Sequence, residues 1–146
     1  MIQQKFVKYW PPVIVWMCFI FWMSTDTFSS ENTSKVIEPI LHVIFPSLSA
    51  ETLNTTHGLI RKSAHVVEYF VLGLLLFRAF RSDSSQPWDR RWTIYTVIVV
   101  FLYAMSDEFH QTSVTSRSTS VFDVGLDTCG GVLSQIAIML RLRNQH

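Results

Sequence analysis

The stretch SAHVVEYFVLGLLLFRAF, residues Ser63–Phe80, is a nearly continuous apolar run with basic residues on both sides. Three similar runs lie at about 6–23, 92–110 and 121–140. A bilayer core about 30 Å thick needs roughly 20 apolar residues in a helix. The four runs therefore predict an all-α, polytopic membrane protein, a four-transmembrane-helix bundle that forms one domain over residues 1–146.

The composition favours the same class of protein. Hydrophobic residues make up 49% of the 146 residues and charged residues 16%, against the roughly 25% charged residues of soluble domains. So few charges cannot cover a small soluble globule. The formal net charge of +1 offers no basic surface for nucleic acid. We therefore expect membrane lipids as partners and no nucleic acid.

The first apolar run is interpreted as a retained helix and not as a signal peptide. Trp10 and Trp16 are unusual in signal peptides, and no clear small-residue cleavage site follows the run. Pro11 and Pro12 are compatible with the first turn of a helix, where a missing backbone donor costs least.

The distribution of Lys and Arg predicts the orientation of the helices, because cytoplasmic loops carry an excess of these residues. If both termini are inside, the inner set is larger than the outer set. The inner set comprises Lys5, Lys8, Arg78, Arg81, Arg90, Arg91, Arg141 and Arg143, and the outer set comprises Lys35, Arg61, Lys62 and Arg117. The bias predicts a multi-pass protein of the plasma (inner) membrane with both termini cytoplasmic.

The first outer loop contains a short amphipathic segment, Ser34–Phe45. Val36, Ile40 and Ile44 fall on one helical stripe of this segment. It is too short to span a bilayer, so an interfacial segment, a re-entrant segment and a packed cap all remain open. His42 and His57 are expected to be ordinary loop residues.

Ionisable residues inside the apolar runs indicate the functional site. A charge at the bilayer centre costs about 2.5–3.5 kcal/mol, so such residues face the protein interior or water. In the predicted topology they come from the outer ends of three helices and meet at one membrane depth. The candidate site consists of Arg61, Lys62, His65, Glu68, Asp107, Glu108, Gln111, Arg117, Asp123 and Asp127.

The last apolar run also carries small residues at helical spacing. Gly130 and Ser134 are four residues apart, and Gly131 lies beside them. Small residues at this spacing allow two helices to approach closely. We interpret the pattern as packing and not as chemistry.

These residues resemble the VanZ-like family of small membrane proteins. The matching segments are R-K-x-x-H-x-x-E-Y-x-x-L-G at 61–73, S-D-E-x-x-Q at 106–111, Arg117, and S-x-x-D-x-x-x-D-x-x-G at 120–130. The resemblance covers most of the chain and implies a polytopic protein of the cell envelope. The family is named for an antibiotic-resistance protein that lowers susceptibility to the glycopeptide teicoplanin. Two departures are Thr115-Ser116, where the family usually has Pro-Gly, and Asp127, where it usually has Asn.

The first functional hypothesis is a non-enzymatic envelope protein with an outward-facing polar pocket. The pocket would bind a lipid-linked or cell-wall precursor head group and affect glycopeptide susceptibility. Arg61, Lys62 and Arg117 would bind its phosphate or carboxylate, since these cations are the natural partners of such anions.

Three alternatives remain open. In an intramembrane enzyme, His65, Glu68, Asp107 and Glu108 would act as acid and base or ligate a divalent metal. These residues form no fixed metal-binding signature, so no metal and no cofactor is expected. A proton- or ion-coupled transporter would need more than four helices, and hence a homo-oligomer. Finally, the polar residues could form a cluster that fixes the register of the helices and binds no ligand.

Overall fold

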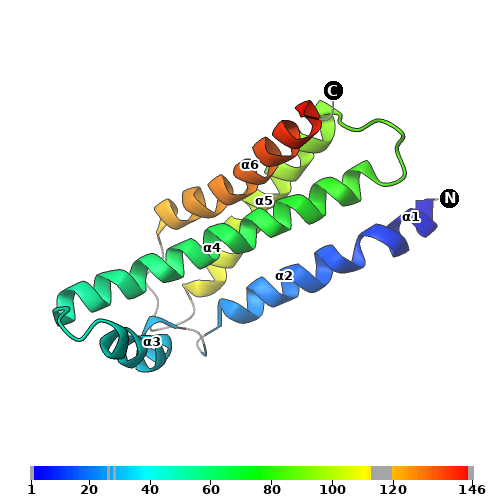
Figure 1. Ribbon diagram of the computed structural model, residues 1–146. Coiled ribbons are helices and arrows are strands. Elements are labelled where there is room, and N and C mark those ends of the chain that lie inside the picture. The colour runs from blue at the N-terminus through cyan, green and yellow to red at the C-terminus, as the bar shows by residue number, and fades with distance from the viewer. Residues whose placement is uncertain (1, 26, 28, 113–119, 145–146) are drawn as a thin grey trace.

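The computed structural model of the chain describes residues 2–25, 27, 29–112 and 120–144 (Figure 1). Over these residues the protein is all-helical and has no strand, which confirms the predicted all-α class. The helices are α1 (Ile2–Tyr9), α2 (Pro11–Met23), α3 (Ser30–Ile44), α4 (Ala50–Arg81), α5 (Arg90–Gln111) and α6 (Val121–Arg143).

Helix α4 is the central element of the bundle. It runs the length of the molecule, with α2 on one side and α5 and α6 on the other, and α3 lies near its N-terminal end (Figure 1). The buried core between these helices is apolar and consists of Val13, Ile20, Tyr69, Leu72, Leu76, Ala79, Val100 and Ala104.

Three helices are long and apolar enough to cross a membrane, namely α4, α5 and α6. The first predicted span is a shorter apolar helix, because Pro11 and Pro12 occupy the first positions of α2 and separate it from α1. The 13 residues of α2 extend about 20 Å, less than the bilayer core of about 30 Å. The prediction of four equivalent spans is therefore confirmed only in part.

The second predicted helix begins at Ala50, well before Ser63, so the predicted start was wrong. Ser49 caps α4 by accepting a hydrogen bond from the backbone N–H of Thr52, at 3.2 Å. Hydropathy detects only the apolar part of a helix, whereas this one continues through a polar first half. Its 32 residues extend about 48 Å, which exceeds the thickness of a bilayer core.

The amphipathic segment of the first outer loop is helix α3, which packs against α4. A hydrogen-bond distance of 3.0 Å joins Thr33 Oγ1 of α3 to His57 Nε2 of α4. His57 is 1% exposed, so the expectation of an ordinary loop histidine was wrong. His57 lies inside α4 and makes a polar contact with α3, whereas the prediction placed it in a loop.

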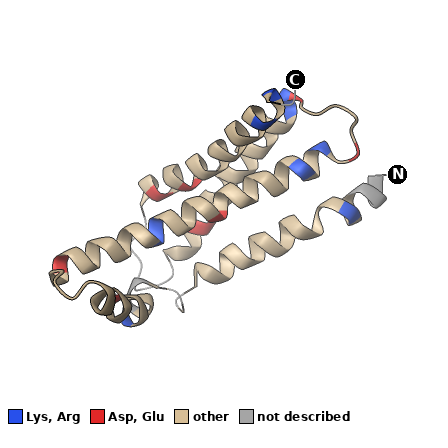
Figure 2. Cartoon of the chain, viewed as in Figure 1, with Lys and Arg blue, Asp and Glu red and all other residues tan. Residues whose placement is uncertain are grey.

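Large apolar side chains cover the outer surface of the bundle. On α5 and α6, Phe101, Leu102, Met105, Met139 and Leu140 are all exposed. An exposed apolar surface of this extent is typical of a protein that contacts lipid. The charged residues, in contrast, occupy only part of the length of each helix (Figure 2).

Basic residues concentrate at one end of the bundle, where α1 begins and α6 ends (Figures 1 and 2). Arg78 and Arg81 lie in the last turn of α4, and Arg141 and Arg143 in the last turn of α6. At the same end, Lys8 forms an ion pair of 2.9 Å with Asp83, which follows α4. These basic residues belong to the set from which the sequence predicts an inner side.

Glycines allow α6 to approach α4 and α5 closely. A Cβ atom added to Gly130 would lie 2.4 Å from the backbone oxygen of Val66 on α4. One added to Gly131 would lie 2.6 Å from Cγ1 of Val100 on α5. The small residues therefore serve helix packing, as the sequence predicts.

Replacing Gly130 with Ala should lower the melting temperature of the purified protein in detergent. The new methyl group would meet backbone, which cannot rotate away, and such overpacking typically costs about 1–3 kcal/mol. Gly125→Ala in the same helix is the matched control, because nothing lies within 4 Å of its added Cβ. Equal destabilisation by both substitutions would contradict the close-approach explanation.

Candidate functional site

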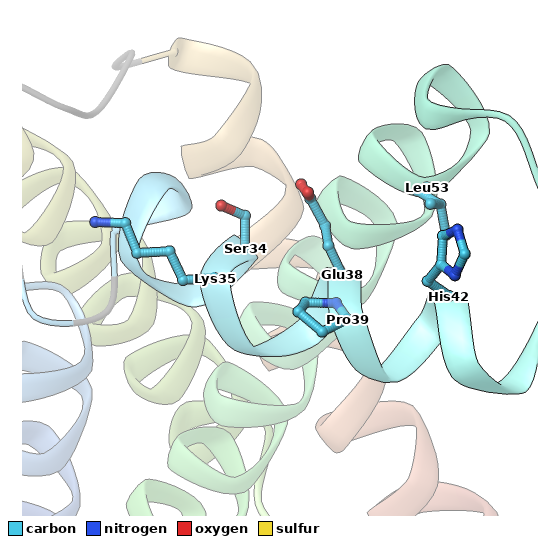
Figure 3. Close-up of a pocket in the computed structure, with 6 residues that line it drawn as sticks. All are labelled: Ser34, Lys35, Glu38, Pro39, His42 and Leu53. Carbon is cyan, nitrogen blue, oxygen red and sulfur yellow. The ribbon is translucent and has the colours of Figure 1, made fainter.

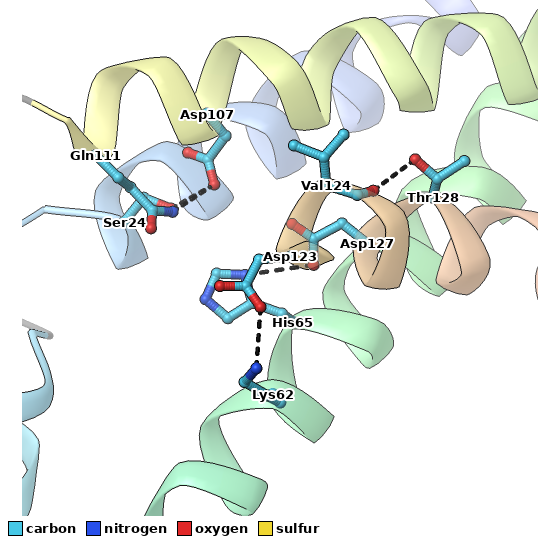
Figure 4. A network of polar contacts seen from close by, with 9 residues as sticks. All are labelled: Ser24, Lys62, His65, Asp107, Gln111, Asp123, Val124, Asp127 and Thr128. Atoms are coloured by element: carbon cyan, nitrogen blue, oxygen red, sulfur yellow. Dashed lines mark hydrogen bonds and ion pairs between the residues drawn. The ribbon is translucent and has the colours of Figure 1, made fainter. Parts of the chain in front are cut away.

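A polar cluster between the helices contains Ser24, Lys62, His65, Asp107, Gln111, Asp123 and Asp127 (Figure 4). Asp107 of α5 lies at its buried end, here called the floor, and is 2% exposed. Its Oδ2 accepts a hydrogen bond of 2.7 Å from the hydroxyl of Ser24 and one of 3.0 Å from the side-chain amide of Gln111 (Figure 4). Gln111 follows Asp107 by one helical turn, whereas Ser24 is the C-cap residue that directly follows α2. The carboxylate thus connects α2 to α5.

His65 of α4 and Asp127 of α6 face each other beside this carboxylate (Figure 4). The distance from His65 Nδ1 to Asp127 Oδ1 is 3.7 Å, and Asp127 is 4% exposed. His65, Asp107 and Asp127 each offer one ligand atom, and these atoms all lie within 4.8 Å of one another. Three helices therefore converge on one small volume.

Lys62 and Asp123 form the outer rim of the polar cluster. Lys62 Nζ lies 3.1 Å from Asp123 Oδ1, and the two side chains are 50% and 32% exposed (Figure 4). An ion pair this exposed contributes little to stability, about 0–1 kcal/mol. The cluster is consequently buried at its floor and open to the surroundings at its rim.

Two glutamates of the predicted site connect helices. The backbone oxygen of Glu68 accepts a hydrogen bond of 2.9 Å from Trp16 Nε1, which joins α4 to α2. The carboxylate of Glu108 accepts a hydrogen bond from the backbone N–H of Ser120, the residue that caps α6. Glu108 therefore helps to hold the start of α6 against the end of α5.

The predicted site residues do not all occupy one place. Arg61 is partly exposed one turn before His65, and its charge acts on His57 beside α3. Arg117 lies outside the described residues. The remaining predicted residues lie at the floor, at the rim or between the helix ends described above.

Two residues of the cluster were missed by the sequence analysis. Ser24 was taken as the first residue of a loop, although it is fully buried and donates to Asp107. Tyr69 is also fully buried, and its hydroxyl interacts electrostatically with Asp107 and Asp127. The sequence did contain a signal for both residues. Ser24 is a polar residue at the end of the first apolar run, and Tyr69 carries a hydroxyl inside the second.

A cavity of about 370 Å³ lies elsewhere, between α3 and the first half of α4 (Figure 3). It is lined by Ser34, Lys35, Glu38, Pro39, His42 and Leu53. None of these residues belongs to the predicted site. The cavity is therefore not part of the polar cluster.

Comparison with known proteins gives one match that covers nearly the whole chain. A protein-family model described as VanZ/LLP1 matches residues 9–142. No curated protein matches the chain, and no solved structure does. The matched range extends from the end of α1 to the last turn of α6 and includes every helix that contributes to the polar cluster.

Ser24→Ala should destabilise the protein by about 1–3 kcal/mol, because it removes a buried donor to the Asp107 carboxylate. Thermal unfolding in detergent measures the effect. Thr128→Val is the matched control, since among the described residues the Thr128 hydroxyl bonds only to the Val124 oxygen of its own helix, at 2.7 Å. A loss no larger than that of the control would show that the Ser24 contact does not hold α2 in place.

Proposed function

Because the chain belongs to the VanZ/LLP1 family, we propose that it is a cell-envelope membrane protein whose polar cluster binds a lipid-linked or cell-wall precursor head group. The observation that carries this proposal is the graded burial of the cluster. Asp107 and Asp127 lie at a buried floor, whereas Lys62 and Asp123 lie at an accessible rim. By binding such a precursor, the protein would lower the susceptibility of the cell to glycopeptides.

The proposed setting is the plasma membrane, with α2 completing a four-helix bundle and both termini in the cytoplasm. The basic end formed by α4, α5 and α6 supports this orientation, because cytoplasmic ends carry the excess of Lys and Arg. The polar cluster would then open toward the outer face, where cell-wall precursors are exposed.

The charges of the cluster favour a head group that carries an amine as well as an anionic group. Among the described residues, the acids are Glu68, Asp107, Glu108, Asp123 and Asp127, and the base at the rim is Lys62. Buried carboxylates are costly unless a cation or a proton offsets them. An amine would therefore pair with the acidic floor, and a phosphate or carboxylate with Lys62 at the rim.

A second candidate is an intramembrane enzyme that acts on an envelope lipid. It is favoured by one observation, an imidazole and two carboxylates within 4.8 Å of one another. Groups of this kind can serve as general acid and base. Incubating the purified protein with an envelope lipid extract separates the two candidates, because only an enzyme produces a new lipid species.

Lys62→Gln should weaken binding of a lipid-linked cell-wall precursor at least tenfold and leave folding intact, because its ion pair is exposed. Binding is measured as the rise in melting temperature when precursor is added to the protein in detergent micelles. Arg141→Gln, an exposed basic residue at the other end of α6, is the control and should bind normally. No precursor-dependent rise for the unmodified chain would overturn the proposal.

The effect on susceptibility is tested separately in cells. Cells that produce the chain should survive higher teicoplanin concentrations than cells that lack it, and Lys62→Gln at equal membrane abundance should remove the difference. If the polar cluster only fixes helix register, Lys62→Gln will retain the phenotype, while Ser24→Ala will reduce protein abundance and phenotype together.

A further inference from the structure

We propose that His65, Asp107 and Asp127 together bind one divalent transition-metal ion, for which Zn²⁺ is the best-suited probe. The ion would occupy the buried floor that the proposed function assigns to an amine of the head group, so ion and amine are alternative partners of the same two carboxylates, and binding of the ion does not depend on a head group. The sequence suggested a different ligand set, with Glu68 and Glu108 in place of Asp127. The three residues belong to α4, α5 and α6, so they form no contiguous sequence motif from which the site could be predicted.

The distances fit a shared cation. His65 Nδ1 and Asp127 Oδ1 are 3.7 Å apart, longer than the 2.7–3.2 Å of a typical N–H···O hydrogen bond. Two ligand atoms at about 2.0–2.2 Å from one Zn²⁺ are roughly 3–4 Å from each other. An ion between His65 and Asp127 thus needs little movement of either. The longest separation within the group, at most 4.8 Å, must shorten by about 1 Å.

The chemistry of the group also suits a divalent cation. Asp107 and Asp127 are 2% and 4% exposed, and two ionised carboxylates at this range repel strongly where water is excluded. The nearby ammonium of Lys62 pairs with Asp123 at the rim. A divalent ion would offset both buried carboxylates, and neutral His65 would supply a nitrogen ligand.

The surroundings of Asp107 resemble the outer shell of a metal site. Its Oδ2 accepts hydrogen bonds from Ser24 and Gln111, at 2.7 and 3.0 Å, which fix the orientation of the carboxylate. Protein metal sites depend on outer hydrogen bonds of this kind, because they hold the ligands in place before the ion arrives. The cluster therefore has an oriented ligand as well as a suitable donor set.

An independent observation comes from Tyr69. Its side chain is fully buried, and its hydroxyl has no hydrogen-bond partner within the part of the chain that the structure describes. Asp107 and Asp127, the two proposed carboxylate ligands, are the acids that interact most strongly with this hydroxyl electrostatically, so Tyr69 belongs to the same polar cluster. Three protein ligands leave one position of a tetrahedral Zn²⁺ for water. A water bound there would give Tyr69 the hydrogen bond that a buried hydroxyl needs.

The test uses the full chain in detergent, treated with a chelator and then titrated with Zn²⁺ alone. Calorimetry and elemental analysis should find one bound Zn²⁺ per chain. Asp107→Asn and Asp127→Asn should each weaken binding at least tenfold, since an amide oxygen is a much poorer ligand than a carboxylate. In Asp107→Asn the amide oxygen can still accept from Ser24 and Gln111, so folding should persist.

Asp83→Asn is the control, because this carboxylate pairs with Lys8 at the opposite end of the bundle. It should bind Zn²⁺ as the unmodified chain does. Loss of binding in Asp83→Asn equal to that in the Asp107 and Asp127 variants would overturn the proposal. So would bound zinc no greater than in a protein-free detergent blank, whatever the folding of the variants.

Cobalt provides a readout that a purely structural cluster would not produce. Co²⁺ bound by one imidazole and two carboxylates should give a visible absorption band, which His65→Gln should shift or abolish. Tyr69→Phe should alter the band and weaken binding severalfold while it preserves the packing of the ring. No band with Co²⁺, or a band unchanged in His65→Gln, would exclude His65 as a ligand. None of these measurements contains a head group, so this proposal and the proposed function fail independently.

Discussion

Carboxylates that are buried among apolar helices must meet polar partners, and this requirement controls how the bundle is assembled. Asp107 meets Ser24 and Gln111, and Asp127 meets His65, so α2, α4, α5 and α6 all contribute to one cluster. In lipid the alternative is a charge with no water to solvate it. The register of the helices therefore depends on bringing these few side chains to the same level.

Close helix packing brings the side chains of this cluster near enough to one another to contact a single ligand or ion. Gly130 brings α6 against the backbone of α4 near Val66, the residue that follows His65. Asp127 lies one turn before Gly130, so the contact that excludes a side chain also positions the carboxylate beside the imidazole. The close approach of α6 to α4 therefore accounts both for the packing of the two helices and for the position of the polar site.

Much of the fold could be predicted, and the errors have physical causes. Hydropathy located the apolar parts of all the long helices, because burial in lipid demands continuous apolar runs. Hydropathy gave wrong helix bounds where a helix is longer or shorter than its apolar run. Helix α4 extends through polar residues back to Ala50, and α2 is shortened by Pro11. His57 was missed because its environment depends on how α3 packs against α4.

The sequence by itself determined the class of the protein, the basic end of the bundle and the set of ionisable residues that cannot face lipid. Each of these follows from composition and spacing along one chain. Only the tertiary structure decided which of those residues meet: His65 with Asp107 and Asp127, Lys62 with Asp123, and Ser24 with Asp107. These contacts join separate helices, and their rotation and depth are set by packing, which spacing along the chain does not record.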